Sequence, residues 1–478
     1  MYKKKAHIHF IGIGGIGMSG IATILKYQGF TISGCDSDLQ QKSIQDLQHI
    51  GCSIYQGNNN TQCKDASIDI VVYSSAIKAN NPEIIDAQKR GIPTIGRALM
   101  LAELMRTKYS IAIAGAHGKT TTTSLISHIL IEAKKDPTVI IGGHLKNIST
   151  NARFGAGDFL VAEADESDRS LLSLQATLAV ITNIDLEHLE TYKDLDDVKN
   201  TFLQFLNNLP FYGKAFLCSD NENIRSLLPL PHIKTIKYGA QEEYADIFAK
   251  DITLNPDHSI FTVYEKGSTQ PLGTVKFMMP GKHNVLNALA AIAVSRDLDI
   301  SFETISNALL NFGGIDRRFT FKGIYRGAEL FDDYGHHPEE INQTLFVAER
   351  RKKNKLIVIF QPHRYTRTQH LWDFFIHIFL THQIDHLIIT DIYPASEASI
   401  PGISSEIFTN AILKKNPICS VTYVPYEQDF SAMIKVLDTV IKPNDLVLFQ
   451  GAGKINKLAT QLCAEPLPTQ PEVARTLL

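Results

Sequence analysis

The sequence predicts an α/β protein with parallel sheets, built from three consecutive domains. Short apolar runs typical of buried strands alternate along the chain with stretches of helical periodicity, and glycine-rich turns join strand to helix at two places. A chain of 478 residues is also too long for one hydrophobic core. We place a Rossmann-like domain at residues 1–107, a phosphate-loop domain at 108–318 and a further α/β domain at 319–478.

Composition and charge narrow the class of protein. The formal net charge is -3, whereas nucleic-acid-binding proteins normally carry a basic surplus, so we expect no nucleic-acid partner. The six cysteines form no Cys-x-x-Cys pair, which is typical of a reducing cytoplasm without disulfides or a zinc site. No apolar run approaches the roughly 20 residues of a membrane span. We therefore expect a cytoplasmic protein without a membrane span, and the sequence leaves monomer and homodimer open.

The first domain begins with a strand, a turn and a helix. Residues 6–11 predict a strand, residues 16–28 a helix and residues 30–36 a second parallel strand. The turn is glycine-rich and an acidic residue closes the second strand, as in dinucleotide-binding folds. These residues are Gly12, Gly14, Gly15, Gly17 and Asp36. Alone the pattern predicts NAD, but the same geometry serves any diphosphate, and a purely structural turn is the alternative.

The second domain opens with the most specific pattern in the chain. A predicted buried strand at residues 109–113 leads into a glycine-rich turn, and a helix is predicted at residues 124–133. Backbone N–H groups at such a turn bind phosphate, the lysine reaches the outer phosphates, and a threonine hydroxyl binds Mg²⁺. The turn comprises Gly115, Ala116, His117, Gly118, Lys119, Thr120 and Thr121. Although its glycines are closer together than in the standard loop, the turn predicts a nucleoside triphosphate site.

Acidic residues follow the next predicted strands of this domain. Glu163 begins an acidic run after the strand at residues 159–162, and His188 lies in a second polar run after residues 178–182. A carboxylate at such a strand end is where a phosphate-loop protein holds Mg²⁺. We predict that Thr120, Glu163 and His188 hold one or two metal ions, with a solvated acidic loop as the alternative.

The remaining elements follow from the same patterns. Alternating segments at residues 247–254, 259–264 and 273–278 predict a small antiparallel sheet, and residues 284–296, rich in alanine and leucine, predict a helix. In the third domain, further apolar strands are predicted at residues 356–360, 386–390, 421–424 and 446–449.

The third domain carries two polar clusters. Residues 332–338 hold two aspartates, a tyrosine and two histidines at the start of a predicted helix, where Pro338 suits the first turn. Arg364 and Arg367 follow the strand at residues 356–360, and arginines just past a strand end can hold a carboxylate bidentately. The first cluster predicts a functional site, and the two arginines predict a binding site for a carboxylate, with solvated surface charges as the alternative for the arginines.

Together these motifs resemble those of the Mur ligases, the ATP-dependent amide-forming enzymes of peptidoglycan synthesis. Seven motifs occur in the family's order, at residues 9–20, 116–120, 163–168, 280–288, 316–319, 333–338 and 361–367. Two positions depart from the family's usual residues. Ala116 stands where threonine is common, and Glu187 stands where aspartate is common before the metal histidine.

The resemblance implies roles for the candidate residues. The glycine turn and Asp36 would bind the UDP part of the substrate, with Ser74 and Ser75 beside them, and His117 would face the substrate's carboxylate. Besides the phosphate loop, ATP would contact Asn284, Asn287, Arg317, Arg318 and Asp333. The amino acid would contact His336, His337, Arg364 and Arg367. The residues expected to act in catalysis are Lys119, His117, Glu163, His188, Arg364 and Arg367.

The implied reaction joins L-alanine to the carboxylate of UDP-N-acetylmuramate through an acyl phosphate, with ATP and Mg²⁺. An NAD-dependent dehydrogenase is the first alternative, and Lys119 with Thr120 disfavours it. A non-catalytic relative would be expected to lack Lys119, Glu163 or His188, which this chain has. A sibling that attaches a preformed peptide is disfavoured by motif detail. Glycine and serine stay open as the amino acid, because one methyl group contributes only about 1–3 kcal/mol to discrimination.

Overall fold

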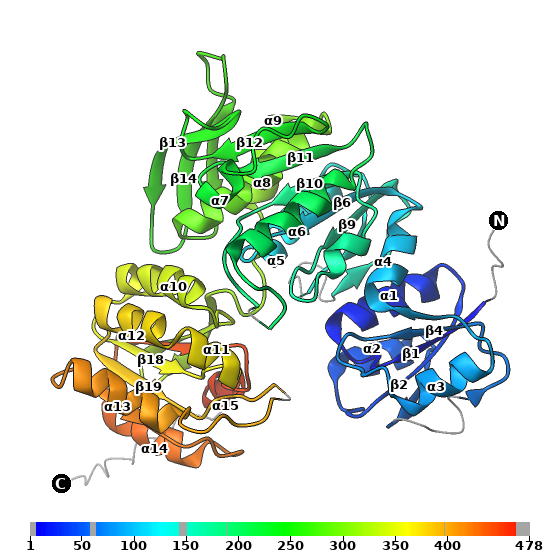
Figure 1. Cartoon of the computed structure of the whole chain (residues 1–478). Coiled ribbons are helices and arrows are strands. Elements are labelled where there is room, and N and C mark those ends of the chain that lie inside the picture. Colours follow the sequence, from blue (N-terminus) through cyan, green and yellow to red (C-terminus); the bar gives the residue numbers. More distant parts are fainter. Residues whose placement is uncertain (1–5, 58–63, 143–150, 189, 396, 465–478) are drawn as a thin grey trace, which may run out of the picture. The chain divides into compact units, whose positions relative to one another are not determined.

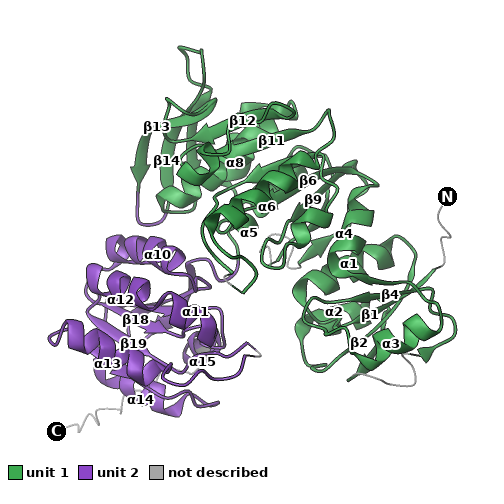
Figure 2. Cartoon of the chain, in the orientation of Figure 1, with its two compact units in different colours: residues 1–254, 258–315 green, residues 255–257, 316–478 purple. Residues whose placement is uncertain are grey.

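The computed structural model describes residues 6–57, 64–142, 151–188, 190–395 and 397–464. The chain divides into two compact units, coloured separately in Figure 2. Unit 1 comprises residues 1–254 and 258–315, and unit 2 comprises residues 255–257 and 316–478. Among the described residues, no helix is both long and apolar enough to span a membrane.

Unit 1 begins with a five-stranded parallel sheet in the order β3-β2-β1-β4-β5 (Figure 1). Its strands are β1 (His7–Ile11), β2 (Thr31–Asp36), β3 (Ser53–Gln56), β4 (Ile70–Tyr73) and β5 (Thr94–Gly96). Its helices are α1 (Ile16–Tyr27), α2 (Lys42–His49), α3 (Pro82–Lys89) and α4 (Arg97–Met105). The strand order reverses between β1 and β4, and ligands of open parallel sheets bind at such a switch point. The turn after β1, which carries Gly12 to Gly17, lies there.

A ten-stranded sheet forms the rest of unit 1, in the order β15-β14-β13-β12-β11-β10-β6-β9-β7-β8. Its strands are β6 (Tyr109–Ala114), β7 (Thr138–Ile140), β8 (Ala152–Arg153), β9 (Phe159–Glu163), β10 (Leu178–Ile181), β11 (Lys214–Cys218), β12 (Lys234–Gly239), β13 (Ile247–Leu254), β14 (Ser259–Glu265) and β15 (Gly273–Phe277). The pairs of β13 with β14 and of β14 with β15 are antiparallel, as the alternating segments predict. However, β13 also pairs in parallel with β12, so these strands extend the central sheet instead of forming a separate one.

The helices of this part of unit 1 are α5 (Lys119–Glu132), α6 (Leu195–Asn207), α7 (Glu222–Arg225), α8 (Lys282–Asp297) and α9 (Phe302–Leu310). The start of α5 differs from the expectation, because the helix begins at Lys119 and not at residue 124. The threonines at its start have low helix propensity. Thr121, Thr122 and Thr123 are nevertheless buried, so tertiary packing decides their conformation.

Unit 2 contains a six-stranded sheet in the order β16-β17-β21-β18-β19-β20, parallel except for the pair of β16 with β17. Its strands are β16 (Thr320–Tyr325), β17 (Ala328–Asp333), β18 (Leu356–Phe360), β19 (His386–Ile389), β20 (Val421–Tyr423) and β21 (Leu446–Gln450). Its helices are α10 (Pro338–Arg351), α11 (Tyr365–His370), α12 (Trp372–Thr381), α13 (Ser405–Lys415), α14 (Ser431–Val440) and α15 (Asn456–Ala464). Alternate residues of β18 enter two different buried clusters, so both faces of the sheet are covered.

The unit boundary lies between Ile315 and Asp316, and unit 1 contains both of the first two sheets. Buried residues of the two sheets belong to one continuous apolar cluster. Asn151, next to β8, donates hydrogen bonds from its Nδ2 to Ile16 O at 2.6 Å and to Ser19 Oγ at 2.9 Å on α1. The domain boundaries predicted after residues 107 and 318 stay predictions.

Candidate active site

The phosphate-loop turn lies between β6 and α5 and is closely packed on both sides. Gly115 and Gly118 have φ angles of 136° and 82°. A Cβ atom at Gly115 would lie 2.1 Å from Thr182 Oγ1, and one at Gly118 would lie 2.5 Å from Asn287 Oδ1. Both positions therefore require glycine, for conformation and for space.

The residues after β10 hold this turn in place. Asn183 Oδ1 accepts a hydrogen bond from His117 N at 2.8 Å, and Asn183 Nδ2 donates to His117 O at 2.9 Å. Thr182 Oγ1 also donates to His117 O, at 2.5 Å. Sequence analysis assigned no role to Asn183, although its place directly after a predicted buried strand is a usable signal. These contacts fix the backbone of the turn before any phosphate binds.

Lys119 is held at the start of α5 by an ion pair. Its Nζ lies 2.8 Å from Glu166 Oε1 and donates to Gly115 O at 2.6 Å and to Ala116 O at 3.2 Å. Burial alone would lower the pKa of Lys119, but the charge and the hydrogen bond of Glu166 raise it above its usual value. The side chain therefore stays protonated and positively charged, as expected of a group that binds phosphate oxygens.

A candidate metal cluster lies beside this lysine. Ligand atoms of Glu166, Glu187 and His188 all lie within 4.8 Å of one another, and the buried Oε2 of Glu166 has no hydrogen-bond partner among the described residues. Carboxylate oxygens are the ligands that Mg²⁺ prefers, so the donor set fits a divalent cation. Burial lowers the pKa of His188, but hydrogen bonds to Glu166 and Glu190 and the charge of Glu187 raise it to about 9. A cation bound through His188 would therefore displace a proton.

Of the predicted metal ligands, only His188 belongs to this cluster among the described residues. Glu163 ends β9, is not part of this cluster among the described residues, and accepts a hydrogen bond at Oε1 from Gly142 N at 2.9 Å. Thr120 lies half-buried in the first turn of α5. Glu166 lies in the cluster with His188, although sequence analysis selected Glu163 from the same acidic run. Only the path of the chain after β9 distinguishes the positions of these two carboxylates. The roles of Thr120, Glu163 and His188 stay predictions.

The turn after β1 is built around Asp36. Gly14 N donates to Asp36 Oδ2 at 2.8 Å, while Asp36 Oδ1 accepts from Asp38 N at 3.1 Å and from Gln41 Nε2 at 3.3 Å. Asp36 thus shapes the turn, and its predicted contact with the ligand stays a prediction. Helix α1 follows at once, and the N–H groups of its first turn form an anion-binding end.

One cavity of about 350 Å³ in unit 1 brings the two predicted phosphate sites together. Gly15, Gly17, Ser74 and Ser75 line it from the first sheet's side. Lys119 and Glu163 line it from the phosphate loop's side. Arg97, which sequence analysis did not select, also lines it. The sequence predicts two phosphate sites about 100 residues apart, and the fold places their residues around one space.

The two predicted asparagines lie on α8, beside the phosphate loop. Both are buried, and Asn287 Oδ1 accepts a hydrogen bond from Thr122 Oγ1 at 3.2 Å. Asn284 Nδ2 donates to Pro280 O at 2.7 Å. The structure places Asn287 against Gly118, whereas the predicted contact of both asparagines with adenine stays a prediction.

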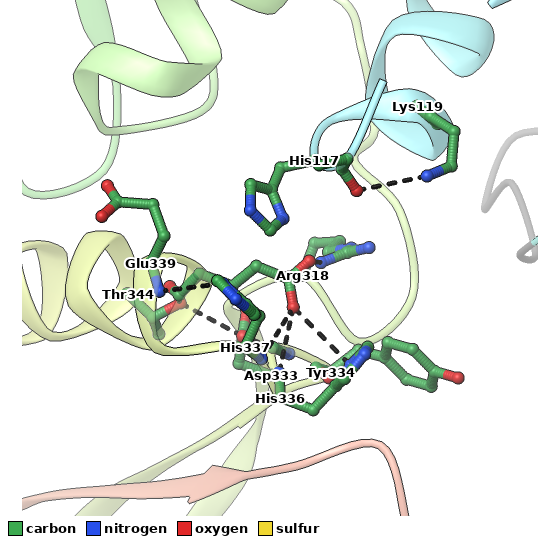
Figure 3. A network of polar contacts seen from close by, with 12 residues as sticks. His117, Lys119, Arg318, Asp333, Tyr334, His336, His337, Glu339 and Thr344 are labelled. Carbon is green, nitrogen blue, oxygen red and sulfur yellow. Dashed lines mark hydrogen bonds and ion pairs between the residues drawn. The ribbon is translucent and has the colours of Figure 1, made fainter. Parts of the chain in front are cut away.

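In unit 2, Asp333 is the centre of a network at the start of α10 (Figure 3). Its Oδ1 accepts from Gly335 N at 2.8 Å, from Thr344 Oγ1 at 3.1 Å and from Gln450 Nε2 at 2.9 Å. Its Oδ2 accepts from Phe319 N at 2.8 Å. Asp333 therefore connects β17, α10 and β21 by hydrogen bonds. Its predicted role at the ribose of ATP stays a prediction.

The two neighbouring arginines are also engaged within unit 2. Arg317 Nε lies 3.3 Å from Asp332 Oδ2, and Arg318 Nη1 lies 3.4 Å from Glu340 Oε1. Both guanidinium groups lie near the ring of Tyr334, at 4.8 Å and 5.7 Å from its centroid. The residues assigned to ATP are thus divided between the two units.

The predicted amino-acid site is only partly assembled. His337 is the N-cap residue of α10, and its Nδ1 accepts a hydrogen bond from Glu339 N at 3.3 Å. This imidazole ring therefore stabilises the start of the helix. The rings of His336 and His363 are 5.5 Å apart, and Arg367 Nη1 lies 3.4 Å from His363 Nδ1. Arg364 instead lies 3.9 Å from a carboxylate oxygen of Glu397.

The two facing imidazoles are neutral. Burial, with nearby arginine charges, lowers the pKa of His336 to about 4, although Glu340 opposes this shift. Burial, His336 and nearby arginines lower the pKa of His363 to about 3. His363 received no role from the sequence, although it lies in the same motif as Arg364 and Arg367.

Three family models match the chain in order. They are the Mur ligase family, catalytic domain over residues 7–109, the Mur ligase middle domain over 113–295, and the Mur ligase, glutamate ligase domain over 317–453. The chain therefore belongs to the Mur ligase family, which are ATP-dependent ligases. The resemblance inferred from the sequence and the three-domain α/β architecture are both confirmed.

Within that family, two curated relatives and one solved structure are named for the same activity. The UDP-N-acetylmuramate--L-alanine ligase of Geobacter sp. (strain M21) is 48% identical over 457 residues, which are 95% of this chain and 96% of that protein. The enzyme of that name from Geotalea uraniireducens is 49% identical over 456 residues, covering 95% and 97%. The crystal structure of UDP-N-acetylmuramate-alanine ligase MurC from Thermotoga maritima has a TM-score of 0.78 and 26% identity, covering 95% of this chain and 98% of that one.

Proposed function

We propose that this chain is an ATP-dependent ligase that joins L-alanine to the carboxylate of UDP-N-acetylmuramate in the synthesis of peptidoglycan precursors. One observation carries the proposal beyond the names of the relatives. Residues of the diphosphate-binding turn and Lys119 of the phosphate loop line one cavity, so a UDP-linked acid and the outer phosphates of ATP can meet there.

The first half of the reaction activates the acid. A carboxylate is a poor acyl donor because oxide is not a usable leaving group. Attack of the carboxylate on the γ-phosphorus of ATP gives an acyl phosphate and ADP. Lys119 lies at the phosphate loop with its charge maintained by Glu166, and offsets the charge on the transferred phosphoryl oxygens. A bound Mg²⁺, held near Glu166, Glu187 and His188, would add charge neutralisation there.

The second half joins the amine. The neutral amine of alanine attacks the acyl carbon, and phosphate leaves. Arg367 and Arg364 of unit 2 are the groups that can hold the alanine carboxylate. Because His336 and His363 are neutral, they add no positive charge that would repel an incoming ammonium group. This part of the reaction takes place only if water is kept from the acyl phosphate.

The protein is proposed to act in the cytoplasm, where ATP and UDP-linked sugars are available. None of the cysteines that the structure describes forms a disulfide, in keeping with a reducing compartment.

The test is release of inorganic phosphate and ADP with UDP-N-acetylmuramate, Mg²⁺ and ATP, with and without L-alanine. We expect sustained release only when both co-substrates are present, together with formation of the amide product. Replacing L-alanine with a preformed peptide distinguishes a sibling ligase, and parallel reactions with glycine and serine measure the discrimination of the amino-acid site. No phosphate release with the full mixture would refute the proposal.

A further inference from the structure

Arg97 lies where the glycine turn of the first sheet meets the cavity. It is the first residue of α4 and lines the cavity with Gly15 and Gly17. A Cβ atom at Gly17 would lie 2.9 Å from Arg97 Nη1, so the guanidinium group lies directly against the start of α1.

An acidic residue from the central sheet orients this arginine. Arg97 Nη2 donates to Asp165 Oδ2 at 3.1 Å, and the two side chains are 20% and 40% exposed. This contact holds one side of the guanidinium group.

The rest of the guanidinium group can meet an anion. A guanidinium group has five N–H donors, and the contact with Asp165 is made by Nη2. Nη1 lies beside Gly17, at the helix end where phosphate binds. Leu101, Ile140 and Ile141 also line the cavity, and apolar walls strengthen a contact between opposite charges.

We propose that Arg97 binds the diphosphate of the UDP substrate, together with the glycine turn, and that Asp165 is a positioning residue that holds the guanidinium group over Gly17. The identity of the substrate rests on the proposed function. The diphosphate is favoured over the γ-phosphate of ATP because Arg97 lies against the glycine turn, whereas Lys119 is held by Glu166 at the phosphate loop.

The experiment measures binding of UDP and of uridine to the full chain by calorimetry, without ATP. Arg97→Ala removes the cation. Arg97→Gln removes the charge but can still donate to Asp165, so it serves if the alanine variant does not fold. Arg97→Lys keeps the charge and can keep the ion pair. Arg106→Ala is the matched control, because Arg106 follows the same helix and pairs with exposed Glu103 at 3.0 Å.

We expect Arg97→Ala and Arg97→Gln to weaken UDP binding about tenfold to a hundredfold, the usual loss for a charge-assisted hydrogen bond. Arg97→Lys should weaken it less, and Arg106→Ala should not change it. Uridine, which lacks the diphosphate, should bind all variants alike. In turnover, the KM for UDP-N-acetylmuramate should rise while the KM for ATP stays within about twofold, because only the diphosphate contact is lost.

Unchanged UDP affinity in the folded neutral variants would overturn the proposal, even if UDP-N-acetylmuramate bound more weakly, since Arg97 would then contact the sugar acid. A second outcome would also overturn the proposal: Arg97→Lys binds UDP with full affinity, and both neutral variants fail to fold. Arg97 would then act only through a structural ion pair. The binding assay needs no turnover. A chain that binds UDP through Arg97 but releases no phosphate would therefore refute the ligase proposal and leave this one standing.

Discussion

Lys119 makes structural contacts within unit 1 and is also the residue proposed to bind the outer phosphates of ATP. Its ion pair with Glu166 and its hydrogen bonds to two carbonyls of its own turn fix the ammonium group near the cavity. The glycine-rich turn identifies this lysine in the sequence. Its carboxylate partner lies 47 residues further along and is found only in the folded chain.

Lys119→Met should abolish phosphate release while binding of UDP-N-acetylmuramate persists. It should also lower the free energy of unfolding by about 3 kcal/mol, because Glu166 is left buried without its partner. The double variant Lys119→Met/Glu166→Gln should recover most of that stability and none of the activity. Urea unfolding and phosphate release measure the two effects. Turnover in the stable double variant would show that the lysine is dispensable.

His336 and His363 should make unit 2 sensitive to acid. Their folded pKa values of about 4 and about 3 lie below the ordinary 6.5, so the unfolded chain takes up protons first as pH falls. Their contribution is complete above about pH 6.5 and is lost progressively toward about pH 4 for His336 and about pH 3 for His363, by about 1–2 kcal/mol for each histidine at pH 5.

Urea unfolding at pH 7.5, 6 and 5 measures this loss for the wild type and for His336→Asn/His363→Asn. The wild type should lose more stability than the variant over this range. Equal losses would mean that the two imidazoles are not held neutral.

At the scale of elements, close packing places the phosphate loop. The turn is held by residues after β10 on one side and by α8 on the other. The early start of α5 has the same cause, because the buried threonines extend the helix back to Lys119. The capping box at His337 and Glu340 similarly fixes the start of α10, as Pro338 predicts.

Gly118→Ala tests this packing against a matched control, Gly267→Ala. The two glycines have φ angles of 82° and 86°, so an added methyl group costs each about 1 kcal/mol in backbone strain. Among the described residues other than its chain neighbours, no heavy atom lies within 4 Å of the Cβ position at Gly267, whereas Asn287 Oδ1 lies 2.5 Å from that at Gly118. Gly118→Ala should therefore destabilise the protein more and raise the KM for ATP. Equal losses of stability in the two variants would mean that Asn287 moves away from the added methyl group without a cost in free energy.

At the scale of the whole molecule, the chain has two units with separate buried clusters. One continuous cluster joins both sheets of unit 1, and two others cover the faces of the sheet in unit 2. The glycine turn after β1 and the turn between β6 and α5 belong to unit 1, and Arg364 and Arg367 belong to unit 2. If their predicted ligands bind there, we expect the two units to respond separately to different ligands.

Unfolding should accordingly not be a single two-state transition. The chain has one tryptophan, Trp372, in α12 of unit 2, so its fluorescence reports that unit alone. We expect the fluorescence transition in urea to differ from the circular dichroism transition, and UDP to shift only the latter, because a ligand stabilises the unit that binds it. Coincident transitions that UDP shifts together would show instead that the two units unfold as one.

The sequence by itself determined most of the elements and, through its resemblance to a known family, the reaction class. Apolar runs marked the buried strands, and the glycine turns predicted two phosphate sites, because these features depend on local conformation and on period. Pro338 likewise marked the start of α10. These signals need no knowledge of distant residues, which is why they could be found in the printed sequence.

Only the tertiary structure decided which side chains meet. It paired Lys119 with Glu166, grouped His188 with Glu166 and Glu187, and placed Arg97 on the glycine turn. These contacts join residues far apart along the chain, and no local period or spacing encodes them. Strand order and close packing bring them together, and that is a property of the folded chain.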